Sequence, residues 1–172
     1  FFLFYFILPP TNHYLVEVLM EISSGFPKGD QIVRGVCIAD LHFGMRRTEE
    51  MYQNELPAFL DFIRTHDLDI INIDGDYFDR QLVLTEQAAK YAMHFFGELA
   101  MICKERHIRL RVIKGTESHE RSQLDNFTSY LLDKDLDLRI FSTVAEEDIL
   151  GMHVLYIPEE YPKDAKAYYA PY

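Results

Sequence analysis

Five short apolar segments along the chain are typical of β-strands. QIVRGVCIAD (31–40), LDIINIDGD (68–76) and IRLRVIKG (108–115) are nearly continuous apolar runs, as expected for strands that are buried on both faces of a sheet. LRIFST (138–143) and MHVLYIP (152–158) have the composition of later strands. The first three segments are therefore predicted to form the centre of a sheet.

Helical periodicity fills the gaps between these strands. Apolar residues recur at three- and four-residue spacing over residues 85–106. A second helix is expected over residues 48–65, with a threonine cap, and Pro57 predicts either a kink or a regular helix that begins near Asn54. A shorter helix is expected over residues 122–132. Alternating strands and helices predict right-handed crossovers, a mostly parallel sheet and the α/β class.

Composition narrows the class of protein without naming a function. The chain has 172 residues, 48% of them hydrophobic and 26% charged, which indicates one globular domain or a piece of a larger one. A net charge of −11 excludes a protein that binds nucleic acid by charge alone. Cys37 and Cys103 lie far apart, so we expect no disulfide framework and no cysteine zinc cluster, as in a cytoplasmic protein.

The N-terminal segment carries no visible chemistry. FFLFYFIL is followed by Pro9 and Pro10, is too short to cross a membrane and has no basic residue before it. Met20 is a natural start. We therefore expect residues 1–29 to be an extension, either non-native or a genuine strand or helix, ahead of a domain over residues 30–172.

Polar side chains follow each of the first three strands. Asp40-Leu41-His42 comes after the first, Gly75-Asp76-Tyr77-Phe78-Asp79 after the second, and residues 115–120 (GTESHE) after the third. Because the carboxyl ends of parallel strands meet at one edge of a sheet, these loops are expected to converge. Their carboxylates would repel one another unless a cation lay among them, so the pattern indicates a divalent metal site.

The three loops resemble the motifs of a known enzyme family. IADLHFG, INIDGDYFD and VIKGTESHE are similar to the D-x-H, G-D-x-x-D and G-N-H-[DE] motifs of the calcineurin-like metallophosphoesterases, over about residues 32–157. The flanking residues are most similar to the DNA repair exonuclease branch, which includes phage members. The resemblance implies a layered α/β/β/α sandwich whose first, mostly parallel sheet is present here and whose C-terminal half is missing.

The resemblance also implies a mechanism and a set of site residues. It implies phosphodiester hydrolysis by a hydroxide held between two divalent ions, with Mn²⁺ the leading candidate and Fe, Mg or Zn the alternatives. DNA is the implied substrate, an ATPase subunit the implied partner, and no membrane is involved. The implied metal ligands are Asp40, His42, Asp76 and Ser118, the catalytic residue is His119, which acts on the leaving oxygen or the phosphate, and the outer carboxylates are Asp79 and Glu120.

The chain departs from the family pattern in two places. Ser118 stands where the family has asparagine, so either this serine, Thr116 or Glu117 is expected to bind the second metal. The later G-H-x-H motif has no match, and His153 is expected to be an ordinary strand residue. A phosphatase or small-molecule phosphodiesterase therefore stays open, as does a truncated domain that binds metal or phosphate without turnover.

Basic residues are concentrated in one run, from Lys104 to Lys114. Arg109 and Arg111 alternate with apolar residues, so both are expected on an exposed strand face, as a phosphate-tracking surface or as a solvated edge strand. Arg46 and Arg47 follow the first motif and are interpreted either as contacts to a substrate phosphate or as part of a solvated loop.

Overall fold

The computed structural model describes residues 4–5, 18–23, 32–160 and 162–172. Its strands are β1 (Phe4–Tyr5), β2 (Val18–Ser23), β3 (Ile32–Ile38), β4 (Ile70–Asp74), β5 (Arg109–Ile113), β6 (Leu138–Phe141), β7 (Ala145–Ile149) and β8 (Met152–Tyr156). Its helices are α1 (Thr48–Glu50), the π-helix η1 (Met51–Glu55), α2 (Leu56–Thr65), α3 (Gln87–Arg106), α4 (Glu117–Glu120), the 3-10 helix η2 (Gln123–Leu132) and α5 (Ala165–Tyr169).

The predicted α/β class and the mostly parallel sheet are confirmed. Strands β1 to β6 form one six-stranded sheet in chain order, in which β3, β4, β5 and β6 run parallel. Strands β1 and β2 join it antiparallel beside β3. Both lie in the segment 1–29 that the sequence sets apart as an extension; the other residues of that segment lie outside the described part.

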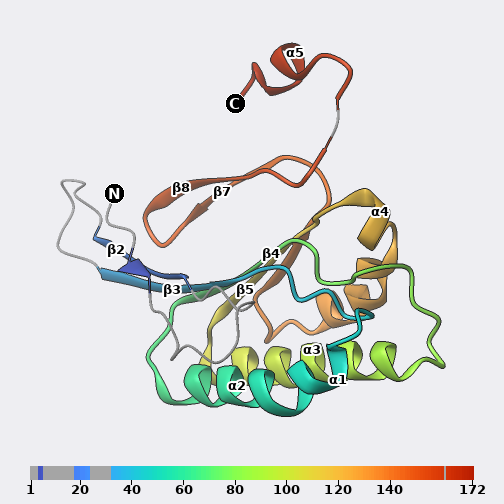
Figure 1. The fold of residues 1–172 in the computed structure, drawn as a ribbon. Coiled ribbons are helices and arrows are strands. Elements are labelled where there is room, and N and C mark those ends of the chain that lie inside the picture. The colour runs from blue at the N-terminus through green and yellow to red at the C-terminus, as the bar shows by residue number, and fades with distance from the viewer. Residues whose placement is uncertain (1–3, 6–17, 24–31, 161) are drawn as a thin grey trace.

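Two layers cover the sheet, one on each face (Figure 1). Helices α2 and α3 pack on one face, against apolar strand residues such as Ile71, Ile73 and Val112. The β7–β8 hairpin lies over the other face, where Val33 and Ile70 contact Ile149. Because strand side chains alternate between faces, neighbouring residues of one strand serve two different cores.

The prediction that Arg109 and Arg111 lie on an exposed face of β5 is wrong. Strand β5 lies between β4 and β6, so it is no edge strand, and Arg111 is buried with 1% of its surface exposed. Its guanidinium binds both carboxylate oxygens of Glu147 on β7, at 2.8 and 2.9 Å. Arg109, two residues earlier, is half-exposed and pairs with Asp137 at 3.5 Å. Arg111 therefore joins the sheet to the hairpin layer and is not part of an exposed phosphate-binding surface.

The expected helix over residues 48–65 is present, with a π-helical interruption. Pro57 falls in the first turn of α2, and η1 comes just before it, which accommodates the missing backbone N–H of proline within a continuous helical segment. Thr48 does not cap this helix, because its hydroxyl accepts the Gly44 N–H and donates to the Met45 carbonyl. The threonine therefore closes the turn between β3 and α1.

Two further elements differ from expectation. Strand β7 was not predicted, because its sequence AEEDI is mostly acidic, and the expected helix over residues 122–132 is the 3-10 helix η2. Among the described residues, no helix combines the length and the apolar character that a membrane span requires.

Candidate metal centre

Backbone pairing brings the first two motif loops together beyond the ends of their strands. The N–H groups of His42 and Phe43 donate to the carbonyls of Asp76 and Tyr77, both at 2.9 Å, and the Asp79 N–H donates back to the Phe43 carbonyl at 3.0 Å. The parallel alignment of β3 and β4 thus continues into the loops. The first and second motifs are therefore held in a fixed register.

Three candidate ligands converge at this edge of the sheet. His42, Asp76 and His119 each offer a ligand atom, and these atoms all lie within 4.8 Å of one another. His42 Nε2 lies 3.9 Å from Asp76 Oδ2, and His119 Nδ1 lies 3.4 Å from the same oxygen. The two imidazole rings meet edge to face, with centroids 5.2 Å apart. This group could hold a metal ion.

Asp40 lies beside this group on its solvent side. Its Oδ1 is 3.7 Å from His42 Nε2, and its side chain is 71% exposed. Asp40, His42 and Asp76 all have positive φ, between 47° and 55°. Such backbone strain in residues other than glycine is concentrated at functional sites, since the surrounding structure must stabilise it.

Glycines allow the second and third motif loops to touch. Gly75 has φ of +87°, and a Cβ on it would lie 2.9 Å from the Gly115 Cα. A Cβ on Gly115 would collide with the backbone nitrogen and the Oδ1 of Asp76. The side chain of Asp76 therefore occupies the space that any larger residue at position 115 would need, which explains the glycine in the third motif.

Thr116 orients the central carboxylate. Its N–H donates to Asp76 Oδ1 at 2.7 Å, and its hydroxyl lies 3.2 Å from Asp76 Oδ2. The same hydroxyl also lies 2.6 Å from Glu159 Oε2, and the Glu159 N–H donates to the Lys114 carbonyl. Glu159 follows β8 and carries no motif, so sequence reasoning missed it; only the structure brings it to the site.

His42 is oriented as a metal ligand would be. His42 Nδ1 and His119 Nδ1 are buried and make no hydrogen bond within the described part of the chain. His42 Nδ1 faces Asp79 Oδ1 at 3.5 Å, which leaves Nε2 toward Asp40 and Asp76. A carboxylate behind the far nitrogen of a ligating imidazole is a common way to fix its orientation. The donor set of two imidazoles and carboxylates therefore fits a divalent transition metal.

Glu120 ties the second and third loops together from beneath. It is fully buried, with Oε1 accepting the Tyr77 N–H and Oε2 accepting the Gly115 N–H, both at 2.6 Å. Burial raises the pKa of Glu120, and the two backbone N–H groups oppose that rise. Both oxygens are thus used to hold the loop that carries His119.

Replacing Glu120 by glutamine is expected to loosen this connection. A glutamine has one acceptor oxygen, so its NH₂ group would face one of the two backbone donors. We expect a loss of about 1–3 kcal/mol in the free energy of unfolding and a weakening of metal affinity by roughly 10–100-fold. Urea denaturation and a manganese titration measure the two effects. Glu117→Gln, at an exposed position in the same helix, is the matched control and should change neither by much.

An open cleft of about 530 Å³ runs alongside the cluster. Its walls include Asp40, Asp74, Asp76 and Glu159, with Lys114 the basic residue among them. The Lys114 ammonium is paired with Glu117. This side of the site is therefore strongly acidic and is suited to cations.

The other predicted site residues lie outside this group. Ser118 is exposed on α4, and Glu117, also exposed, is turned to Lys114. His153 lies on β8, where its Nδ1 is 2.8 Å from Asp148 Oδ1. Arg47 pairs with Glu50 and Glu55 instead of standing free, and Arg46 is exposed.

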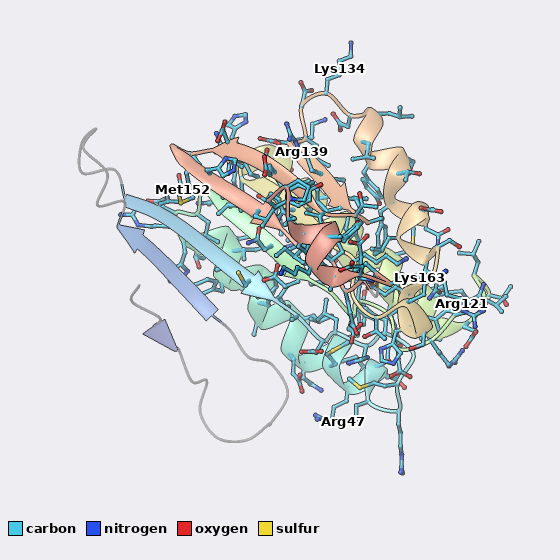
Figure 2. The ribbon with its side chains drawn as sticks, turned by 90° about the horizontal axis from the view of Figure 1, so that it is seen from above. Arg47, Arg121, Lys134, Arg139, Met152 and Lys163 are labelled. Carbon is cyan, nitrogen blue, oxygen red and sulfur yellow. The ribbon has the colours of Figure 1, made fainter. Side chains whose placement is uncertain are left out.

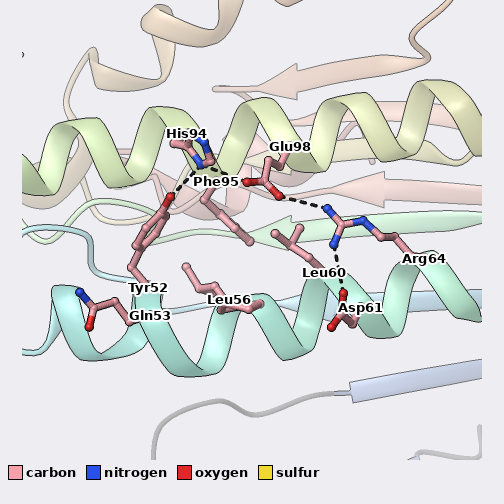
Figure 3. Close-up of a pocket in the computed structure, with 10 residues that line it drawn as sticks. Tyr52, Gln53, Leu56, Leu60, Asp61, Arg64, His94, Phe95 and Glu98 are labelled. Carbon is pink, nitrogen blue, oxygen red and sulfur yellow. Dashed lines mark hydrogen bonds and ion pairs between the residues drawn. The ribbon is translucent and has the colours of Figure 1, made fainter.

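A second hollow, of about 300 Å³, lies between α2 and α3 (Figure 3). Its polar groups are paired with one another: Tyr52 with His94 at 2.7 Å, and Arg64 with both Glu98 and Asp61 at 3.1 Å. The polar residues around this hollow are therefore explained by contacts at the surface between two helices.

Comparisons with known proteins give a likeness to solved structures and no family. No protein-family model matches the chain, and no curated protein matches it. Among solved structures, the chain is similar to the nuclease MPE of Pseudomonas putida, at 17% sequence identity and a TM-score of 0.41. The match covers 72% of this chain and 59% of that one, so the chain spans less than two thirds of the length of that structure.

Proposed function

We propose that this chain belongs to a metal-dependent hydrolase that cleaves phosphodiester bonds. The observation that carries the proposal is the convergence of His42, Asp76 and His119, from three separate strand-end loops, within 4.8 Å. Three separate loops hold these polar groups together at a cost in desolvation and backbone strain, and a bound cation would offset that cost.

Each residue has a defined part in this proposal. Asp40, His42 and Asp76 would hold the metal, and Ser118 or Thr116 would complete a second site. The metal would supply Lewis-acid stabilisation of the phosphate and a hydroxide nucleophile at neutral pH. Asp79 orients His42, Thr116 orients Asp76, and Glu120 fixes the third loop. His119 protonates the leaving oxygen or positions the phosphate.

Nucleic acid, DNA in the first place, is the proposed substrate, with manganese and a pair of ions as the proposed cofactor. Membership of the DNA repair exonuclease branch and an ATPase partner are carried over from the motif resemblance only. The test is hydrolysis of bis(4-nitrophenyl) phosphate and of a duplex DNA with added Mn²⁺ and with chelator. Chelator-sensitive cleavage supports the proposal. Tight metal binding without cleavage of either substrate would assign a binding role instead.

The role of His119 gives a separate prediction. His119→Ala is expected to lower turnover by roughly 10²-fold on substrates with a poor leaving group, since general acid catalysis is worth about that much. The loss should shrink on a nitrophenyl ester, whose leaving group needs no proton. Steady-state kinetics on both substrates measure the difference. Equal losses on both would argue that His119 positions the phosphate.

A further inference from the structure

The turn of residues 80–86, which follows the second motif, is stabilised by an ion pair and by hydrogen bonds among its own residues. Arg80 binds both carboxylate oxygens of Glu86, at 2.6 and 3.2 Å. Glu86 Oε1 also accepts the Val83 N–H at 2.8 Å, and the Glu86 N–H donates to the Val83 carbonyl at the same distance. The hydrogen bonds from Arg80 lower the pKa of Glu86 to about 2, so the closing pair stays ionised at neutral pH.

The base of the turn is anchored independently of its tip. Gln123, which is 6% exposed, accepts the Leu82 N–H at 2.7 Å and donates to the Arg80 carbonyl at 2.9 Å. The Leu82 side chain packs against the main core. The fold therefore needs nothing further from the residues at the tip.

The tip nevertheless presents two large apolar side chains to solvent. Val83 is 63% exposed and Leu84 is 66% exposed. Single exposed apolar residues are ordinary, whereas two in succession on a turn fixed by an ion pair and by hydrogen bonds are suited to contact another molecule. We call these two residues the apolar tip.

The turn that carries the apolar tip is joined to the motif loops and to a basic side chain, since Gln123 donates to the carbonyls of both Arg80 and His119. Asp79, which faces His42 at 3.5 Å, immediately precedes the turn. Arg121, two residues after His119, is exposed and donates to the side-chain oxygen of Gln81 at 3.1 Å. The guanidinium of Arg121 thus contacts a neutral amide, whereas the guanidinium of Arg80 forms an ion pair with Glu86. Neither the turn nor Arg121 lines the acidic cleft, so a polyanion that avoids the carboxylates of the cleft is expected to approach beside the turn.

We infer that the apolar tip packs against the bases at the end of a nucleic-acid strand while Arg121 binds a backbone phosphate. This rests on the proposed function, because it names the substrate class of that site. Apolar wedges from a protein commonly contact or separate stacked bases, and a cation beside them binds the phosphate. A small phosphoester has no bases and would not use the tip.

The decisive measurement is binding, which is independent of turnover. A fluorescein-labelled DNA duplex with a single-stranded tail and phosphorothioate linkages, which resist hydrolysis, is titrated with the 172-residue chain in Mn²⁺ and followed by anisotropy. We expect Val83→Ser/Leu84→Ser to raise Kd about tenfold. Arg121→Gln should raise Kd and lower the slope of log affinity against log salt by about 1.

Matched controls lie at the other end of η2. Leu131→Ser/Leu132→Ser likewise replaces two successive exposed apolar residues by serine, and Lys134→Gln removes one exposed charge. Figure 2 shows Lys134 well away from Arg121, and η2 separates them by roughly 20 Å at about 2 Å per residue. Both controls should leave Kd within about twofold of the unchanged protein, well inside the tenfold effect expected of the tip.

The outcomes separate this inference from the proposed function. A protein that binds the duplex through the tip yet never hydrolyses a phosphodiester would refute the function and keep the inference. An unchanged Kd in the double variant would overturn the inference, and lost self-association in that variant would then assign the tip to protein contacts. Equal loss of duplex cleavage and of bis(4-nitrophenyl) phosphate hydrolysis would also overturn it, because the turn would then support the centre itself.

Discussion

Asp76→Asn is expected to abolish phosphodiester hydrolysis, with a fall in rate of more than about 10²-fold. Asp76 Oδ2 lies 3.9 Å from His42 Nε2 and 3.4 Å from His119 Nδ1, so its negative charge is central to the cluster. An asparagine keeps the size and one oxygen but removes that charge. Initial rates with saturating Mn²⁺, and a manganese titration followed by calorimetry, measure the loss of activity and of metal affinity.

Asp79→Asn is the matched control for this prediction. It makes the same chemical change three residues later, at a carboxylate that faces His42 Nδ1, the ring nitrogen turned away from Asp76. An outer carboxylate of this kind is worth roughly tenfold in activity. A rate in Asp76→Asn that equals the wild type would remove Asp76 from the centre, and equal losses in both variants would show that the two carboxylates act alike.

The position of the candidate centre could be predicted because one rule of sheet topology determines it. Asp40, Asp76 and His119 lie far apart in the chain, and the parallel alignment of β3, β4 and β5 alone brings their loops to one edge. The order of apolar runs was enough to predict that alignment. Which atoms face one another inside the centre depends on side-chain packing, which periodicity does not describe.

The misplacement of Arg111 has a physical cause. Alternation along β5 correctly puts Arg111 on the face opposite Leu110 and Val112, but it does not tell what covers that face. The cover is the β7–β8 hairpin, whose acidic sequence hides its strand character. Glu147 is polar and yet 8% exposed, because Arg111 supplies its partner. Each of these charged residues is buried because it pairs with the other, so the sequence of β5 or of β7 considered alone predicts that its charged residue is exposed.

Contacts made at long range were beyond prediction for the same reason. Thr116 meets Glu159 across 43 positions, and Gln123 meets Leu82 across 41. Glu159, Gln123 and Leu82 stand in no motif, and polar residues such as glutamate and glutamine occur throughout the chain. Local signals also failed at Thr48, where a residue type that suits a helix cap instead closes the preceding turn.

Arg111→Met is expected to lower the free energy of unfolding by about 3–5 kcal/mol, because it leaves a buried carboxylate without its main partner. The Arg111 guanidinium donates to both oxygens of Glu147 and also to the Asp137 carbonyl at 2.9 Å. Tyr156 donates to Glu147 at 3.1 Å and cannot replace a charge, and Arg139, which lies 3.3 Å from Glu147 Oε1, is 54% exposed and therefore a weaker partner than Arg111. Urea unfolding at neutral pH, followed by circular dichroism, measures the loss.

The loss of stability in Arg111→Met is expected to be larger at neutral pH than at acid pH. Burial alone would raise the pKa of Glu147, but the hydrogen bonds and charge of Arg111 hold it below its ordinary value of 4.5. The stability that this carboxylate contributes is therefore present above about pH 4.5 and is lost as pH falls through the lower pKa of the folded state. The difference between wild type and Arg111→Met should accordingly shrink when unfolding is repeated below about pH 4.

Two further variants separate the buried pair from a general effect of charge on β5. Arg109→Met changes the same residue type two positions earlier, where the side chain is 34% exposed and its ion pair with Asp137 spans 3.5 Å. Exposed pairs contribute at most about 1 kcal/mol, so this variant should unfold close to wild type. The double variant Arg111→Met/Glu147→Leu should recover much of the stability, since it leaves no charge of the pair buried alone. A double variant no more stable than Arg111→Met would show that the hairpin layer depends on the ion pair itself and not on relief of an unpaired charge.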